Sequence, residues 1–85
     1  MKKMIKVASI GYQKDAAQAT VEYDLSGETY SFTVAAKLSL LVSMTVEEVR
    51  AYIVSRVEAE RARRLRELVE GMLDGLVGVD LEAVQ

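Results

Sequence analysis

The sequence predicts an α+β fold: a small antiparallel β-meander of about three strands, followed by one long amphipathic helix packed on one face of the sheet. Before residue 36, apolar and polar residues alternate along the chain, which is typical of half-buried strands. From Thr45 to about residue 76, apolar residues recur every three or four positions without a proline, which is typical of a helix. We expect one domain over residues 1–85.

Residues 4–12 predict the first strand. Ile5 and Val7 would lie on one face, with Ala8, Ile10 and Tyr12 on the other, so the pattern alone specifies no single buried face. The polar residues 13–17 form a connection of hairpin length.

A β-hairpin is the clearest local signal, with strands at about 19–25 and 28–36 around a turn at Ser26–Gly27. This turn pairs the apolar residues of one face: Ala19 with Val34, Val21 with Phe32, and Tyr23 with Tyr30. The residues between them are polar, so the other face is expected to be wet. The three apolar pairs all fall on one face of the hairpin, and this agreement supports the predicted register.

Residues 35–44 are rich in apolar side chains but have no clear period. They could extend the third strand, form a short fourth strand, or make a helical turn under the sheet. In each case we expect the segment to be buried.

The long helix is expected over residues 46–76. Thr45 and Glu48 match a capping box, and Gly78 is a plausible stop. The first half should dock on the sheet through a stripe of four aliphatic side chains, Val46, Val49, Ile53 and Val57, which would meet Tyr23, Tyr30, Phe32 and Val34.

The helix is too long for the sheet. About thirty helical residues span about 45 Å, whereas an eight-residue strand spans about 27 Å. The apolar residues of the distal half then have no sheet beneath them: Leu65, Leu68, Val69, Met72, Leu73 and Leu76. If these side chains stay exposed to solvent, the chain loses on the order of 10 kcal/mol of stabilisation that their burial would provide. We therefore predict that they form an oligomer or partner interface.

A second copy of the chain, joined through an isologous helix pair, is the favoured cover. Gly71 and Gly75 form a small-residue notch that would allow close helix approach, although this spacing is a weak signal outside membranes. The alternatives are a bend near residues 59–62 that folds the helix back, one heterologous protein partner, and a helix end that frays.

Residues that could carry catalysis are scarce. The chain has no histidine or cysteine, and it lacks hydrolytic triads, phosphate-binding glycine loops and zinc spacings. Glu22 and Asp24 would lie on one strand face, which is compatible with weak calcium or magnesium binding, but ordinary surface carboxylates explain them better. We therefore predict a non-enzyme with no cofactor, no metal site and no catalytic residue.

Nucleic-acid binding is the alternative function. It would use Lys2, Lys3, Lys6 and Lys14 together with the helix arginines, of which Arg61, Arg63, Arg64 and Arg66 are clustered. Four acids flank that cluster and the net charge is −2, so a solvated, self-paired helix face is preferred. Tyr12, Tyr23, Tyr30 and Phe32 could stack bases, but three of them are needed under the helix.

The sequence thus predicts a small protein–protein interaction module that forms a homodimer and acts as an assembly factor or a stoichiometric inhibitor. A compact phage accessory protein would suit the size, but no motif indicates that origin. The longest apolar run, residues 38–44, is too short to span a bilayer. The lack of cysteine fits a cytoplasmic protein.

Overall fold

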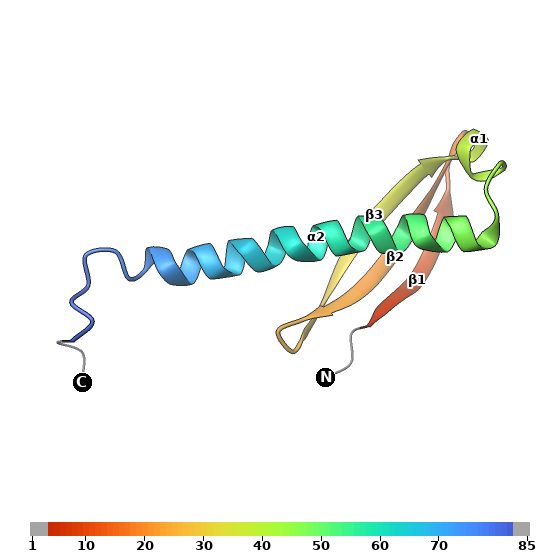
Figure 1. Ribbon diagram of the computed structural model, residues 1–85. Helices are drawn as coiled ribbons and strands as arrows, with labels where there is room; N and C mark the ends of the chain where they lie inside the picture. The colour runs from red at the N-terminus through yellow and green to blue at the C-terminus, as the bar shows by residue number, and fades with distance from the viewer. Residues whose placement is uncertain (1–3, 83–85) are drawn as a thin grey trace.

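The computed structural model describes residues 4–82. It shows a three-stranded antiparallel sheet crossed by a long helix (Figure 1), which confirms the predicted fold class. The elements are β1 (Ile5–Tyr12), β2 (Ala16–Leu25), β3 (Glu28–Lys37), α1 (Leu38–Leu41) and α2 (Val46–Asp74), and the strand order is β1-β2-β3.

The β2–β3 hairpin has the predicted register, including all three of the expected apolar pairs. Ser26 and Gly27 have φ angles of 53° and 79°, and two consecutive positive φ angles match the twist of the flanking strands. β2 starts at Ala16 and not at residue 19, because Ala16 and Ala17 continue the pairing with the end of β3. The apolar pairs thus define the face on which the helix packs.

A β-bulge in β1 changes which residues face the helix. The pairing with β2 shifts between Val7 and Ser9, so one extra residue is accommodated there and the side chains after it change face. Directly paired residues lie on the same face. The residues of β1 that pair with the apolar face of β2 are Ile5 and Val7 before the bulge, and Ile10 and Tyr12 after it.

The expectation that Ile5 and Val7 lie opposite Ile10 and Tyr12 is therefore wrong. All four side chains belong to the helix-side face of the sheet, because the bulge compensates for the change from odd to even positions.

The core lies between α2 and the two strands of the hairpin. Its buried apolar residues are Ala19, Val21, Tyr23, Leu25, Val34 and Val57. Ile53 packs against this core, but Val46 is 75% exposed because α2 starts at the margin of the sheet (Figure 1). The expected docking of Val46 is therefore wrong.

Residues 35–44 combine two of the three alternatives. β3 continues to Lys37, and the single helical turn α1 follows. The apolar residues of α1 and of the residue after it are not buried as expected: Leu40 is 47% exposed and Val42 is 84% exposed. The reason is that α1 lies at the end of the sheet and not beneath it (Figure 1).

α2 is one continuous helix that extends well beyond the sheet (Figure 1). The Thr45 hydroxyl accepts from the Glu48 amide at 3.1 Å, and the Glu48 carboxylate accepts from the Thr45 amide at 2.9 Å, so the capping box is present. No bend occurs at residues 59–62, and the helix ends at Asp74, two residues before the expected end.

The resulting shape is elongated. The structure measures 60 × 26 × 18 Å, with a radius of gyration of 18.0 Å, against about 12 Å for a compact domain of this length. The excess length is the distal part of α2, which has no other element of residues 4–82 packed against it (Figure 1).

Candidate interaction surface

A polar junction holds α2 on the sheet. Arg61 is only 7% exposed, and its guanidinium donates to the backbone oxygens of Asp24 and Met4 at 3.1 and 3.0 Å. It also pairs with the Asp24 carboxylate at 3.2 Å and with Glu58 at 2.7 Å. The expectation that Arg61 lies on a solvated helix face is wrong, because the strand ends around Met4 and Asp24 provide acceptors above which the helix passes.

This junction also gives the Asp24 side chain a structural role. Its carboxylate accepts from the Met4 amide at 2.6 Å as well as from Arg61. The proposed divalent-cation pair with Glu22 therefore has no support here. Within residues 4–82, no group of three or more acidic, histidine or cysteine side chains could hold a metal ion.

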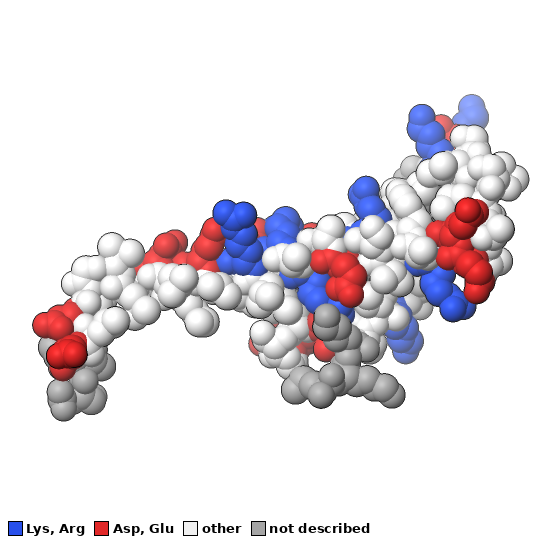
Figure 2. All heavy atoms as spheres, in the orientation of Figure 1, with Lys and Arg blue, Asp and Glu red and all other residues white. Residues whose placement is uncertain are grey.

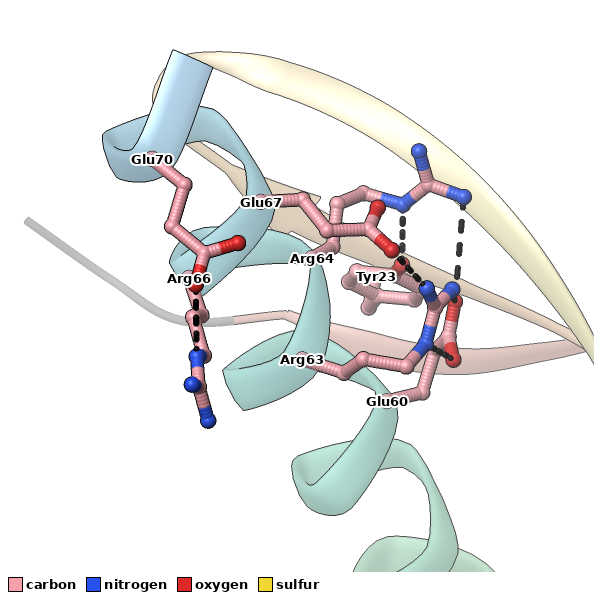
Figure 3. A network of polar contacts seen from close by, with 7 residues as sticks. All are labelled: Tyr23, Glu60, Arg63, Arg64, Arg66, Glu67 and Glu70. Atoms are coloured by element: carbon pink, nitrogen blue, oxygen red, sulfur yellow. Dashed lines mark hydrogen bonds and ion pairs between the residues drawn. The ribbon is translucent and has the colours of Figure 1, made fainter. Parts of the chain in front are cut away.

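A second polar network continues along the helix (Figure 3). Arg64 donates to the Tyr23 hydroxyl at 3.1 Å, and Arg63 pairs with Glu60 at 2.8 Å and also with Glu67. The predicted i,i+4 pair of Glu60 with Arg64 is present but longer, at 3.7 Å. Acidic residues thus pair with the clustered arginines as predicted, while Glu60 is buried against the sheet.

The pKa of the Glu60 carboxyl is held below its usual value of 4.5. The hydrogen bond from Arg63 is the largest cause; burial opposes it, and the charges of Arg63 and Arg64 reinforce it. The hydrogen bond to the Tyr23 hydroxyl raises the pKa of the Arg64 guanidinium. Both groups therefore stay charged around neutral pH.

The aromatic residues do not form an open stacking platform. Tyr23 is fully buried and stacks on Tyr30, with ring centroids 5.8 Å apart. Arg64 lies 4.7 Å from the Tyr30 ring centroid and Arg61 lies 5.6 Å from that of Tyr23, so the helix occupies this face. Tyr12 is 76% exposed at the other end of the sheet.

Of the lysines proposed for nucleic-acid binding, Lys2 and Lys3 lie outside the described residues. Lys6 and Lys14 are exposed. The four clustered arginines that would join them form ion pairs with Asp24 and with the acidic residues of α2. Within residues 4–82, the charges of the clustered arginines are therefore already paired with carboxylates and not left for phosphates.

The six predicted interface residues form what we call the distal stripe: Leu65, Leu68, Val69, Met72, Leu73 and Leu76. They are 40–69% exposed, and Leu76 lies just beyond the helix end. Figure 2 shows the distal part of α2 with charged side chains along one side and uncharged ones along the other. On the charged side, Arg66 pairs with Glu70 at 2.9 Å (Figure 3).

A second apolar surface lies beside α2, and sequence reasoning missed it. It is a groove of about 390 Å³, which we call the β1–α2 groove, lined by Ile5, Val7, Val46, Val49, Arg50, Ile53 and Val54. It exists because α2 lies over β2 and β3, leaving the helix-side face of β1 uncovered; Val7 is 42% exposed. Ile5 and Val7 share this face by their two-residue spacing before the bulge, but no local pattern in the sequence indicates that α2 leaves the face uncovered.

A smaller apolar pocket of about 210 Å³ lies between the start of α2 and the end of the sheet near α1, where Leu41, Tyr52 and Ile10 contribute to its wall. None of the helices in residues 4–82 combines the length and the apolar character needed to cross a membrane. Comparison with known protein families, with curated proteins and with solved structures gives no match. The surfaces described above therefore carry the functional argument.

Proposed function

We propose that this chain is a non-enzymatic protein–protein interaction module that forms a homodimer through the distal stripe of α2. The observation that supports the proposal is a helix that continues past its own sheet while six large apolar side chains remain exposed, five on the helix and Leu76 just beyond its end. Monomeric proteins rarely expose contiguous apolar patches of this kind unless the patch binds something.

The free energy at stake is large for so small a chain. Full burial of a large apolar side chain stabilises by roughly 1.5–3 kcal/mol, so six partly exposed residues represent about 5–10 kcal/mol. This is comparable to the whole stability of a small domain. A second copy supplies a complementary surface by symmetry, because an isologous contact uses the same patch twice.

The biological role that fits such a module is that of an assembly factor or a stoichiometric inhibitor, with the sheet end left free for a heterologous protein. The ion pairs of the central arginines favour this role over nucleic-acid binding, because they already neutralise the charges that phosphates would need.

Light scattering on the purified chain tests the dimer directly. The wild type should have the mass of two chains at about 50 µM. Leu68→Glu and Met72→Glu should each give a monomer, because each places a charge in the contact, while circular dichroism stays that of a folded α+β protein. Val42→Glu is the matched control, since Val42 is also exposed but lies outside the stripe. A monomeric wild type at this concentration contradicts the proposal.

A further inference from the structure

We propose that the β1–α2 groove receives the end of the distal stripe of a second copy (Met72, Leu73 and Leu76), so that the two α2 helices lie antiparallel along most of their length. Each sheet is then covered by two helix segments, its own and the end of its partner's. This arrangement rests on the homodimer proposed above and specifies where the partner binds.

The groove and the distal stripe lie on the same side of α2. Val54 lines the groove, and Met72 lies 18 residues further, which is five complete turns at 3.6 residues per turn. Leu65, 11 residues from Val54, is only about 20° away around the helix axis. An antiparallel two-fold pair needs both surfaces on one side, because each helix then presents its stripe where the other presents its groove.

The sheet is wider than one helix, so a second helix could lie partly over its uncovered margin and partly beyond it. Three strands span about 14 Å at 4.8 Å per strand, including their margins, and a helix with its side chains is about 10 Å across. α2 lies over β2 and β3, so the helix-side residues of β1 remain exposed, including Val7 and Ile10. A neighbouring helix at the usual 8–10 Å separation would lie over β1.

The area supports the same arrangement. The distal stripe supplies on the order of 500 Å² per copy, taking roughly 60–120 Å² for each partly exposed aliphatic side chain. A stable interface buries about 800 Å² per partner. The exposed groove residues within the overlap, Val7 and Val54, bring the total to about 600 Å², closer to that value. A contact between the two distal stripes alone falls short.

The symmetry predicts which residues meet. With the two-fold axis near Arg63, Val54 of one copy lies beside Met72 of the other. The small, exposed Ala62 lies close to the axis, where the helices approach one another. The paired helices overlap from about residue 52 to the end of α2, so the dimer is about 60 Å long, against about 80 Å if only the distal stripes overlapped.

Disulfide cross-linking tests this register, because the wild-type chain has no cysteine. Val54→Cys and Met72→Cys are purified separately, one with a mass tag, then mixed and oxidised. The expected product is a covalent heterodimer of the two variants in most of the mixture. Each variant alone should stay uncross-linked, since its two cysteines lie about 27 Å apart along the antiparallel pair, far beyond the 7 Å limit between Cα atoms.

Val69→Cys is the discriminating control. A dimer that overlaps only through the distal stripes brings Val69 beside its own copy, so this variant would cross-link alone. That result, or a dimer in which the mixed variants fail to cross-link, overturns the groove arrangement and leaves the homodimer standing. A monomeric wild type overturns both. Small-angle scattering of the wild-type dimer provides a measurement without any substitution: a maximum dimension near 80 Å contradicts the proposal, and one near 60 Å supports it.

Discussion

The two halves of α2 share one helical backbone and differ in what surrounds them. The anchored half, residues 46–64, contains every buried residue of the helix: Val57, Glu60 and Arg61. The distal half, residues 65–74, contains none, and its side-chain ion pairs run only within the helix. The helix continues because backbone hydrogen bonds and i,i+4 pairs are local, whereas burial depends on what lies opposite.

The comparison also inverts the usual distribution of side chains. In the anchored half, two charged residues are buried. Arg61 donates to backbone oxygens at the strand ends, and Glu60 pairs with Arg63 one turn further along the helix. In the distal half, the large apolar side chains are the exposed ones. Hydrogen-bonded charges thus fix the position and direction of the helix, and the apolar surface remains available for association.

The largest expected effect comes from breaking the anchor. Arg61→Met should lower the free energy of unfolding by about 3 kcal/mol, because it removes the charged partner of the Asp24 carboxylate and one donor from each of two backbone oxygens. Urea unfolding at one fixed protein concentration measures it. Arg66→Met is the matched control in the distal half: its pair with Glu70 is exposed, so the loss should stay below about 0.5 kcal/mol. Equal losses would mean that the two halves are not held differently.

A smaller effect is expected at the start of the anchored half. Thr45→Ala removes the hydroxyl that accepts from the Glu48 amide, which should cost about 1 kcal/mol of unfolding free energy. Ser55→Ala, at an exposed helical position, should change the same quantity by a few tenths of a kcal/mol at most. If Thr45→Ala shows no loss in thermal or urea unfolding, the capping box does not stabilise this end.

The smallest effect concerns pH. The pKa of Glu60 is lowered in the folded chain, so the stability that this carboxylate contributes is fully present above its unfolded value of about 4.5 and is lost as the pH falls through the folded value. Glu60→Gln should therefore lose less thermal stability than the wild type between pH 6 and pH 3. A Glu60→Gln profile parallel to the wild type would show that Glu60 contributes no acid sensitivity.

Much of the fold could be predicted because its signals are local. The β2–β3 register follows from apolar residues at every second position around a two-residue turn, and the helix start follows from Thr45 and Glu48. The length of α2 beyond the sheet follows from the rise per residue in helices and strands. The six residues of the distal stripe were predicted from their helical period together with the excess length of the helix, and the structure places them on the part of the chain that has no sheet beneath it.

The sequence by itself determined the elements, the hairpin register and the excess helix length. Only the tertiary structure decided which residues those elements cover. The bulge after Val7 places all the large apolar residues of β1 on the helix side of the sheet. Because α2 packs over β2 and β3, these residues of β1 stay partly exposed. The same position of α2 on the sheet brings Arg61 over its acceptors at Met4 and Asp24, which are 57 and 37 residues away in the sequence. Backbone periods depend on neighbours in the chain, whereas burial depends on contacts between distant segments, and no local pattern encodes those.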